Sequence, residues 1–232
     1  MSTAPARERM RTDERREHLV RAGVDLLRDK PYDQLSIDDI AAAAGISKGL
    51  LYHYFPSKRE YLLEVVRATA AGIRAATTPD PALSPLEQLE SSIEGFIDFA
   101  QEHARGYAAL FSPGAGGDEE IAALMDESRE IYLAGLFEAM ERAYGLKPGK
   151  GAGSAALRTA MQGYLSFVEG AVLRWLERHE LEREDLRDLL TKAYGGAVRA
   201  ALEIDPELGA RRTPRAPAKT QRSRQSGSAR RH

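Results

Sequence analysis

The chain has 232 residues, of which 43% are hydrophobic and 29% are charged, and it contains no cysteine. This length is enough for one large domain or two small ones, and the lack of cysteine excludes disulfides, thiolate metal sites and a cysteine nucleophile. No apolar run approaches the roughly 18 residues of a membrane helix, and the polar N-terminal stretch does not look like a secretory signal. We therefore expect a cytoplasmic protein that does not bind membranes.

Helical periodicity runs through the chain, and no stretch alternates apolar and polar residues as a strand does. An all-α fold is therefore predicted. Residues 1–11 are polar, and we expect them to be disordered. A first helix is predicted over residues 12–29, with Leu19, Ala22 and Leu26 on its apolar stripe.

Three serines predict the starts of the next helices. Ser36 precedes two aspartates and caps a short helix that ends before Gly45. Ser47 caps a second short helix, and Ser57 opens a longer one that continues to about residue 76. Gly45 stands where the end of a helix requires a positive φ angle.

The rest of the chain predicts further helices separated by Pro- and Gly-rich breaks. A linker with two prolines covers residues 77–84. The helices are expected over residues 84–103, 118–144, 154–179 and 183–204, with a short segment at 105–111. Residues 206–232 form a basic tail that we expect to be disordered. This tail either keeps the protein soluble or adds phosphate contacts as an arm.

Charge is distributed unevenly along the chain. The net charge of −2 combines +1 over residues 1–60, −11 over residues 61–209 and +8 over residues 210–232. A protein that held nucleic acid with its whole surface would not carry so acidic a middle. If the chain binds DNA, a short segment near the N-terminus must make the contacts.

The segment from Ser36 to Phe55 has the pattern of a helix-turn-helix. Small and apolar residues in its first helix allow a close crossing, Gly45 makes the turn, and Leu51 and Phe55 face the core. A short helix of this kind enters the major groove of DNA with its N-terminus first. Its outward residues are Ser47, Lys48, Gly49, Tyr52, His53 and Tyr54.

The sequence Ala44-Gly-Ile-Ser-Lys-Gly-Leu-Leu-Tyr-His-Tyr-Phe-Pro-Ser-Lys58, with Leu35-Ser-Ile-Asp-Asp-Ile-Ala before it, resembles the signature of the tetracycline-repressor (TetR) family. The resemblance covers residues 12–65. It implies a helix-turn-helix DNA-binding domain of three helices over residues 12–60 and a larger helical ligand-binding and dimerisation domain over residues 61–205.

The resemblance also implies roles for individual residues. Phosphate or backbone contacts are implied for Ser36, Ser47, His53, Tyr54 and Lys58, and base or groove contacts for Lys48, Gly49 and Tyr52. Two residues depart from the family pattern. Leu50 stands where many members have threonine, and the acidic Asp38 lies near a position where some have arginine.

Each of the last two predicted helices carries two opposite faces of apolar or small residues. One face joins the core of the chain, and the second favours a partner helix, which predicts a homodimer. The alternative is one large core that uses both faces within one chain. The predicted dimer residues are Gly163, Phe167, Gly170, Arg174, Thr191, Gly195, Val198 and Leu202.

Aromatic, histidine and methionine residues recur in the C-terminal helices. An ordinary core explains most of them, but the family resemblance implies that some line a pocket for a small, partly apolar effector. The candidate pocket residues are Phe99, His103, Tyr107, Met125, Tyr132, Met161, Tyr164 and Trp175.

The sequence has no catalytic motif, no metal-ligand spacing and no cofactor fingerprint, so an enzyme is not expected and we predict no metal or cofactor. The leading hypothesis is a dimeric repressor that binds a palindromic operator in double-stranded DNA and leaves it when the effector binds. An activator or a nucleoid-type DNA binder remains open. A helical ligand-binding or adaptor protein that does not act on DNA is the other alternative, although Lys48, Tyr52 and Lys58 argue against it.

Overall fold

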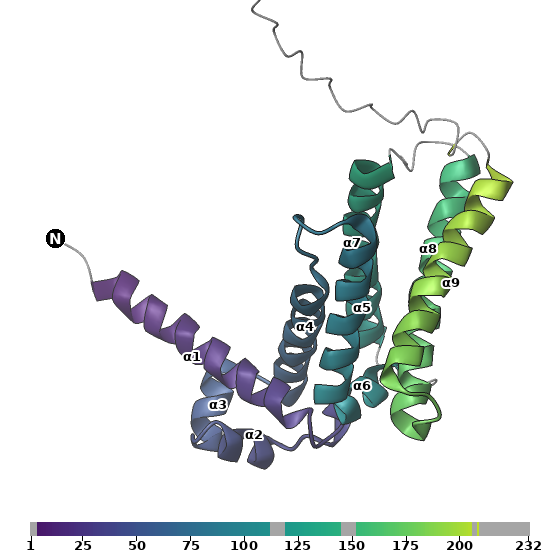
Figure 1. Ribbon diagram of the computed structural model, residues 1–232. Helices are drawn as coiled ribbons and strands as arrows, with labels where there is room; N and C mark the ends of the chain where they lie inside the picture. Colours follow the sequence, from purple (N-terminus) through teal and green to yellow (C-terminus); the bar gives the residue numbers. More distant parts are fainter. Residues whose placement is uncertain (1–3, 112–118, 145–151, 206–207, 209–232) are drawn as a thin grey trace, which may run out of the picture.

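The structure is a computed structural model that describes residues 4–111, 119–144, 152–205 and 208. Within these ranges the chain is helical and has no strand, which confirms the all-α prediction. Figure 1 shows three N-terminal helices at one end of a set of long, roughly aligned helices. The helices are α1 (Ala4–Leu26), η1 (Tyr32–Gln34), α2 (Ile37–Ala43), α3 (Lys48–Tyr54), α4 (Lys58–Thr77), α5 (Pro85–Glu102), α6 (Ala104–Phe111), α7 (Glu119–Tyr144), α8 (Ala152–Arg178) and α9 (Arg183–Ile204).

The predicted caps form in the structure. The hydroxyl oxygens of Ser36, Ser47 and Ser57 each accept a hydrogen bond from the backbone N–H three residues later, at 3.1–3.2 Å. Gly45 adopts a φ angle of 65° between α2 and α3, as the sequence predicts. Local sequence therefore sets the start of each of these helices.

The first helix differs from its prediction. It begins at Ala4 instead of residue 12 and ends at Leu26, where turns follow. Alanine, arginine, glutamate and methionine dominate residues 4–11, and these residues favour a helix even when they are exposed. The short helix η1 was not predicted. The disorder expected for residues 1–3, 206–207 and 209–232, and the role of the basic tail, lie outside the described residues. Leu208, which was expected to be disordered, is instead buried against the C-terminal core.

The N-terminal core includes the beginning of α4. Leu19, Leu27, Leu51, Phe55 and Tyr61 are all fully buried in it. The hydroxyl of Tyr61 donates a hydrogen bond to the backbone oxygen of Leu19 at 2.9 Å, and burial raises the pKa of this hydroxyl well above its usual value. The predicted domain boundary at residue 60 therefore falls inside a single core.

The next turns of α4 belong to a second cluster. Leu63 and Val66 pack with Leu110 of α6 and with Ile121 and Met125 of α7. In Figure 1, α4 runs from the N-terminal helices into the set of long helices. One helix thus connects the two parts of the molecule through opposite faces.

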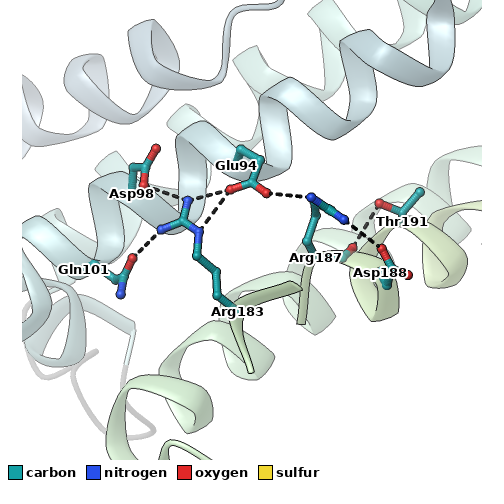
Figure 2. Close-up of polar contacts among 7 residues, drawn as sticks. All are labelled: Glu94, Asp98, Gln101, Arg183, Arg187, Asp188 and Thr191. Atoms are coloured by element: carbon teal, nitrogen blue, oxygen red, sulfur yellow. Dashed lines mark hydrogen bonds and ion pairs between the residues drawn. The ribbon is translucent and has the colours of Figure 1, made fainter. Parts of the chain in front are cut away.

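The C-terminal helices enclose a third cluster, with α8 and α9 side by side (Figure 1). Polar contacts fasten the start of α9 to α5, as Figure 2 shows. Arg183 contacts Glu94 at 3.2 Å, Asp98 at 2.7 Å and Gln101 at 2.6 Å, and Arg187 reaches the other oxygen of Glu94 at 3.4 Å. The two helices are therefore fixed together at the end where α9 begins.

None of the helices in the described ranges combines the length and the apolar character needed to span a membrane.

Candidate nucleic-acid interface

Helix α3 carries one buried face and one open face. Leu51 is buried beneath it, and Phe55, which ends the helix, is buried beside it in the N-terminal core. Five of the predicted DNA-binding residues lie on the open side or at its start: Ser47, Lys48, Gly49, Tyr52 and His53 are exposed. Tyr52 keeps 48% of its surface accessible, which is unusual for a large aromatic side chain. The helix therefore presents a cation, an imidazole and a phenol together.

The other three predicted residues are only partly open. Tyr54, Lys58 and Ser36 are half-buried. The hydroxyl of Ser36 donates to the carboxylate of Asp39 at 2.6 Å while its oxygen caps α2. Ser36 thus already has local partners, and its place in the fold is that of a cap.

Lys48 has an acidic partner on the same surface. Its ammonium forms an ion pair with Asp38 in the first turn of α2, at 2.6 Å, and both side chains are exposed. The carboxylate that departs from the family pattern therefore contacts the exposed cation of α3. Any anion that binds this ammonium has to compete with Asp38.

A second ion pair stabilises the entry to α2. Lys30 contacts Asp39 at 2.8 Å. Lys30, together with the hydroxyl and backbone N–H of Ser36, holds the pKa of Asp39 well below its usual value. The ionised carboxylate thereby helps to keep the segment before α2 in place.

The C-terminal helices enclose a small hollow that we call the inner cavity. Its volume is about 70 Å³, and its walls come from α4, α5, α6, α7 and α8. Three of the predicted pocket residues, Met125, Tyr132 and Tyr164, line it. Polar residues that the sequence analysis missed also line it: Arg74, Ser92, Ser128, Arg129 and Glu169. Single polar residues in helices give no periodic signal that could have found them.

The structure does not bring the other five predicted pocket residues into the inner cavity. Phe99 stacks on His103, whose Nδ1 lies 3.0 Å from the backbone oxygen of Phe99. Tyr107 donates to the backbone oxygen of Glu169 at 2.8 Å. Met161 is buried in the core, and Trp175 donates its indole N–H to the backbone oxygen of Leu181. These side chains pack within the chain and lie outside the inner cavity.

A second hollow, the outer groove, lies between α5, α7 and α9 and has a volume of about 340 Å³. Leu89, Ser92 and Tyr132 line both hollows. The outer groove is also lined by the four residues of α9 predicted for the dimer interface, Thr191, Gly195, Val198 and Leu202. This face of α9 therefore turns toward α5 and α7 of its own chain.

The four residues of α8 predicted for the dimer interface lie elsewhere. Gly163, Phe167, Gly170 and Arg174 are exposed on the surface, and Phe167 keeps 41% of its surface accessible. The structure thus separates the two halves of the predicted interface. It also gathers no group of three His, Asp or Glu side chains that could hold a metal in the part of the chain it describes.

The fold and this surface define a helix-turn-helix protein with an attached helical domain. Residues 19–65 match the family described as "Bacterial regulatory proteins, tetR family", and residues 85–194 match the "Tetracyclin repressor-like, C-terminal domain". The chain belongs to the TetR family of bacterial regulatory proteins, as the sequence resemblance predicts.

Curated relatives and solved structures agree with this assignment. The chain is 31% identical over 145 residues to the transcriptional activator FasR of Mycolicibacterium smegmatis, covering 60% of this chain and 64% of the relative. It is 25% identical over 201 residues to the transcriptional repressor DhaR of Mycobacterium sp., covering 83% and 96%. A tetR-family transcriptional regulator from Streptomyces coelicolor superposes with a TM-score of 0.74 at 26% identity and 86% coverage of each chain. The chain spans less than two thirds of FasR and 57% of the regulator AcuR of Cereibacter sphaeroides.

Proposed function

We propose that this protein is a sequence-specific DNA-binding transcriptional regulator and that α3 is its reading helix. The observation that carries this proposal is the exposed face of α3, where Lys48, Tyr52 and His53 gather above a tightly packed core. A short, rigid helix that offers donors and aromatics fits the major groove. The acidic region over residues 61–209 then keeps the rest of the molecule away from the phosphates.

We propose that the protein acts as a homodimer. The exposed Phe167 and Gly170 of α8 lie beside the exposed Leu181 and Leu189 in one shallow groove. Such an apolar surface favours a second copy, and a two-fold pair would place two reading helices on successive major grooves of a palindromic operator. The α9 residues of the interface are then on the side of Leu189 and not on the side that faces the outer groove.

We propose further that a small, partly apolar effector controls DNA binding and that the regulator is a repressor which the effector releases. The inner cavity supports this proposal because Ile73, Arg74 and Thr77 in its wall belong to α4, the helix whose first turns complete the N-terminal core. An effector that prefers one position of α4 therefore changes the placement of α3.

The experiment begins with mapping of the sites that the protein occupies on chromosomal DNA, followed by gel shifts on the strongest site. We expect one short palindrome per dimer, and weakened binding by the double variant Lys48→Ala, Tyr52→Ala. Lys192→Ala removes an exposed cation from α9 and serves as the matched control. Unchanged binding by the double variant would refute the assigned reading face, and an absence of any specific site would favour a ligand-binding or adaptor protein that does not act on DNA.

A further inference from the structure

The inner cavity contains a hydroxyl group without a partner. Tyr164 of α8 is only 7% exposed, and its hydroxyl has no hydrogen-bond partner among the described residues. Burial, together with the neighbouring Tyr132 and Tyr194, raises the pKa of this hydroxyl, which keeps its proton at neutral pH. A buried donor without an acceptor costs free energy. A ligand oxygen in the cavity would provide the missing acceptor.

Among the described residues, no carboxylate forms an ion pair with Arg74 in the wall of this cavity. The side chain of Arg74 is half-buried, and its guanidinium donates a hydrogen bond to the hydroxyl of Ser128 at 3.2 Å. Arg129 differs, because Glu169 accepts two hydrogen bonds from it, at 2.8 and 3.0 Å, and Asp126 accepts a third at 2.7 Å. Since Arg129 and Glu169 balance each other, Arg74 leaves the wall of the inner cavity with one excess positive charge.

The outer groove lies next to the inner cavity. Leu89, Ser92 and Tyr132 form the shared wall. Beyond them the groove is lined mainly by apolar side chains, among them Leu136, Met140, Val198 and Leu202. The inner cavity, with its cation and its unpartnered hydroxyl, thus lies next to a larger groove lined mainly by apolar side chains. This combination matches a molecule with a compact acidic head and a hydrocarbon tail.

We propose that the inner cavity and the outer groove form one binding site for a free medium-chain carboxylic acid. One carboxylate oxygen accepts a hydrogen bond from Tyr164, the charge is balanced by Arg74, and the hydrocarbon chain occupies the outer groove. The small volume of the inner cavity, about 70 Å³, suits a carboxylate. The inference rests on the proposed function, since it names the class of effector.

The test is isothermal titration of the full-length protein with decanoic acid, 1-decanol and decanoyl-CoA. We expect decanoic acid to bind about tenfold or more tightly than the alcohol, because a charged hydrogen bond to arginine is lost with the alcohol. Arg74→Gln should abolish the preference for the acid, and Tyr164→Phe should weaken binding of the acid about five- to tenfold. Arg67→Gln is the matched control, because Arg67 lies two turns before Arg74 on α4 and pairs with Glu64 at 2.8 Å.

Equal binding of acid and alcohol, or unchanged binding of the acid by Arg74→Gln, would overturn the proposal. Tighter binding of decanoyl-CoA than of the free acid would also overturn it, and so would failure of hexanoic, decanoic and hexadecanoic acids to bind. Circular dichroism and thermal unfolding show whether each variant folds. If Arg74→Gln does not fold, Arg74→Lys is used in its place, because lysine keeps the positive charge but lacks the planar guanidinium. Gel shifts without any acid separate this proposal from the proposed function, since DNA binding by the free protein does not depend on the effector.

Discussion

The backbone N–H of Gly106 donates a hydrogen bond to the carbonyl oxygen of Leu27 across 2.9 Å. This contact joins α6 to the turn that follows α1 and so connects the two parts of the molecule outside α4. An ion pair between Arg28 and Glu102 and a hydrogen bond from Arg105 to the backbone oxygen of Asp29 lie beside it. The contact is possible because position 106 has no side chain.

The first prediction concerns this approach. An added Cβ at Gly106 would lie 2.7 Å from Cβ of Leu27, which is fully buried. Gly106→Ala should therefore lower the free energy of unfolding by about 1–3 kcal/mol, as overpacking does, and thermal unfolding measures it. Gly135→Ala is the control, because nothing lies within 4 Å of its added Cβ, and it should be neutral or stabilising. Equal stability of the two variants would contradict the close packing at Gly106.

The second prediction concerns Asp38, which holds the ammonium of Lys48 at 2.6 Å. Asp38→Asn removes a negative charge from the proposed DNA-reading surface, so DNA affinity should rise about threefold at low salt and less at high salt. The variant should also be slightly less stable, because a negative charge in the first turn of α2 interacts favourably with the helix dipole and is lost in the variant. Gel shifts and thermal unfolding measure the two opposite changes. Weaker DNA binding by Asp38→Asn would mean that the ion pair positions Lys48 for its target.

The third prediction is a pH dependence. Lys30 and Ser36 lower the pKa of Asp39 in the folded protein, so its ionised form favours folding. This contribution is complete above the ordinary aspartate pKa of about 3.9 and disappears as the pH falls toward the lowered pKa. The stability difference between the wild type and Asp39→Asn should thus be largest near neutral pH and shrink in acid. Urea unfolding over a pH series measures it, and a difference that grows in acid would have the wrong sign.

The fourth prediction compares two buried tyrosines without any ligand. Tyr164→Phe removes a hydroxyl without a partner, so the free protein should gain about 1 kcal/mol of stability. Tyr107→Phe removes a hydroxyl that donates to Glu169 at 2.8 Å, so it should lose about 1–2 kcal/mol. Urea unfolding at neutral pH measures both. If both variants lose stability equally, the hydroxyl of Tyr164 has a partner in solution.

The fifth prediction concerns self-association. Phe167→Asp places a charge on the exposed apolar surface of α8, and sedimentation should then detect a 25.5 kDa species where the wild type sediments as a dimer. Ile131→Asp changes an equally exposed apolar residue of α7 and should leave the dimer intact. A wild type that sediments as a monomer at micromolar concentration would exclude the proposed dimer.

The sequence predicts the helix starts well because their signals are local. Ser36, Ser47 and Ser57 cap through atoms three residues away, and Gly45 needs only its own backbone. The exposed face of α3 is predictable for the same reason, since its residues lie within one short segment. The polarity of residues 4–11 predicts disorder, but the same residues have a high helix propensity, and α1 therefore begins at Ala4.

The arrangement of the C-terminal helices could not be predicted in the same way. Periodicity assigns Val198 and Leu202 to a second face of α9, but only the positions of α5 and α7 decide that this face lines the outer groove. The polar wall of the inner cavity depends on Arg74 of α4 lying near Ser128 of α7, 54 residues later. Such pairs arise from long-range packing, which one sequence does not reveal.

Helix α4 limits how this protein can be recombined with others. Tyr61 and Val65 complete the N-terminal core, and the intervening Leu63 already packs toward α6 and α7. A chimera joined at residue 60 would leave the N-terminal core incomplete. One joined after residue 66 would keep Leu63 and Val66, whose side chains fit α6 and α7 of the original domain. Successful exchange of C-terminal domains in this fold would therefore require redesign of one face of α4 together with the junction.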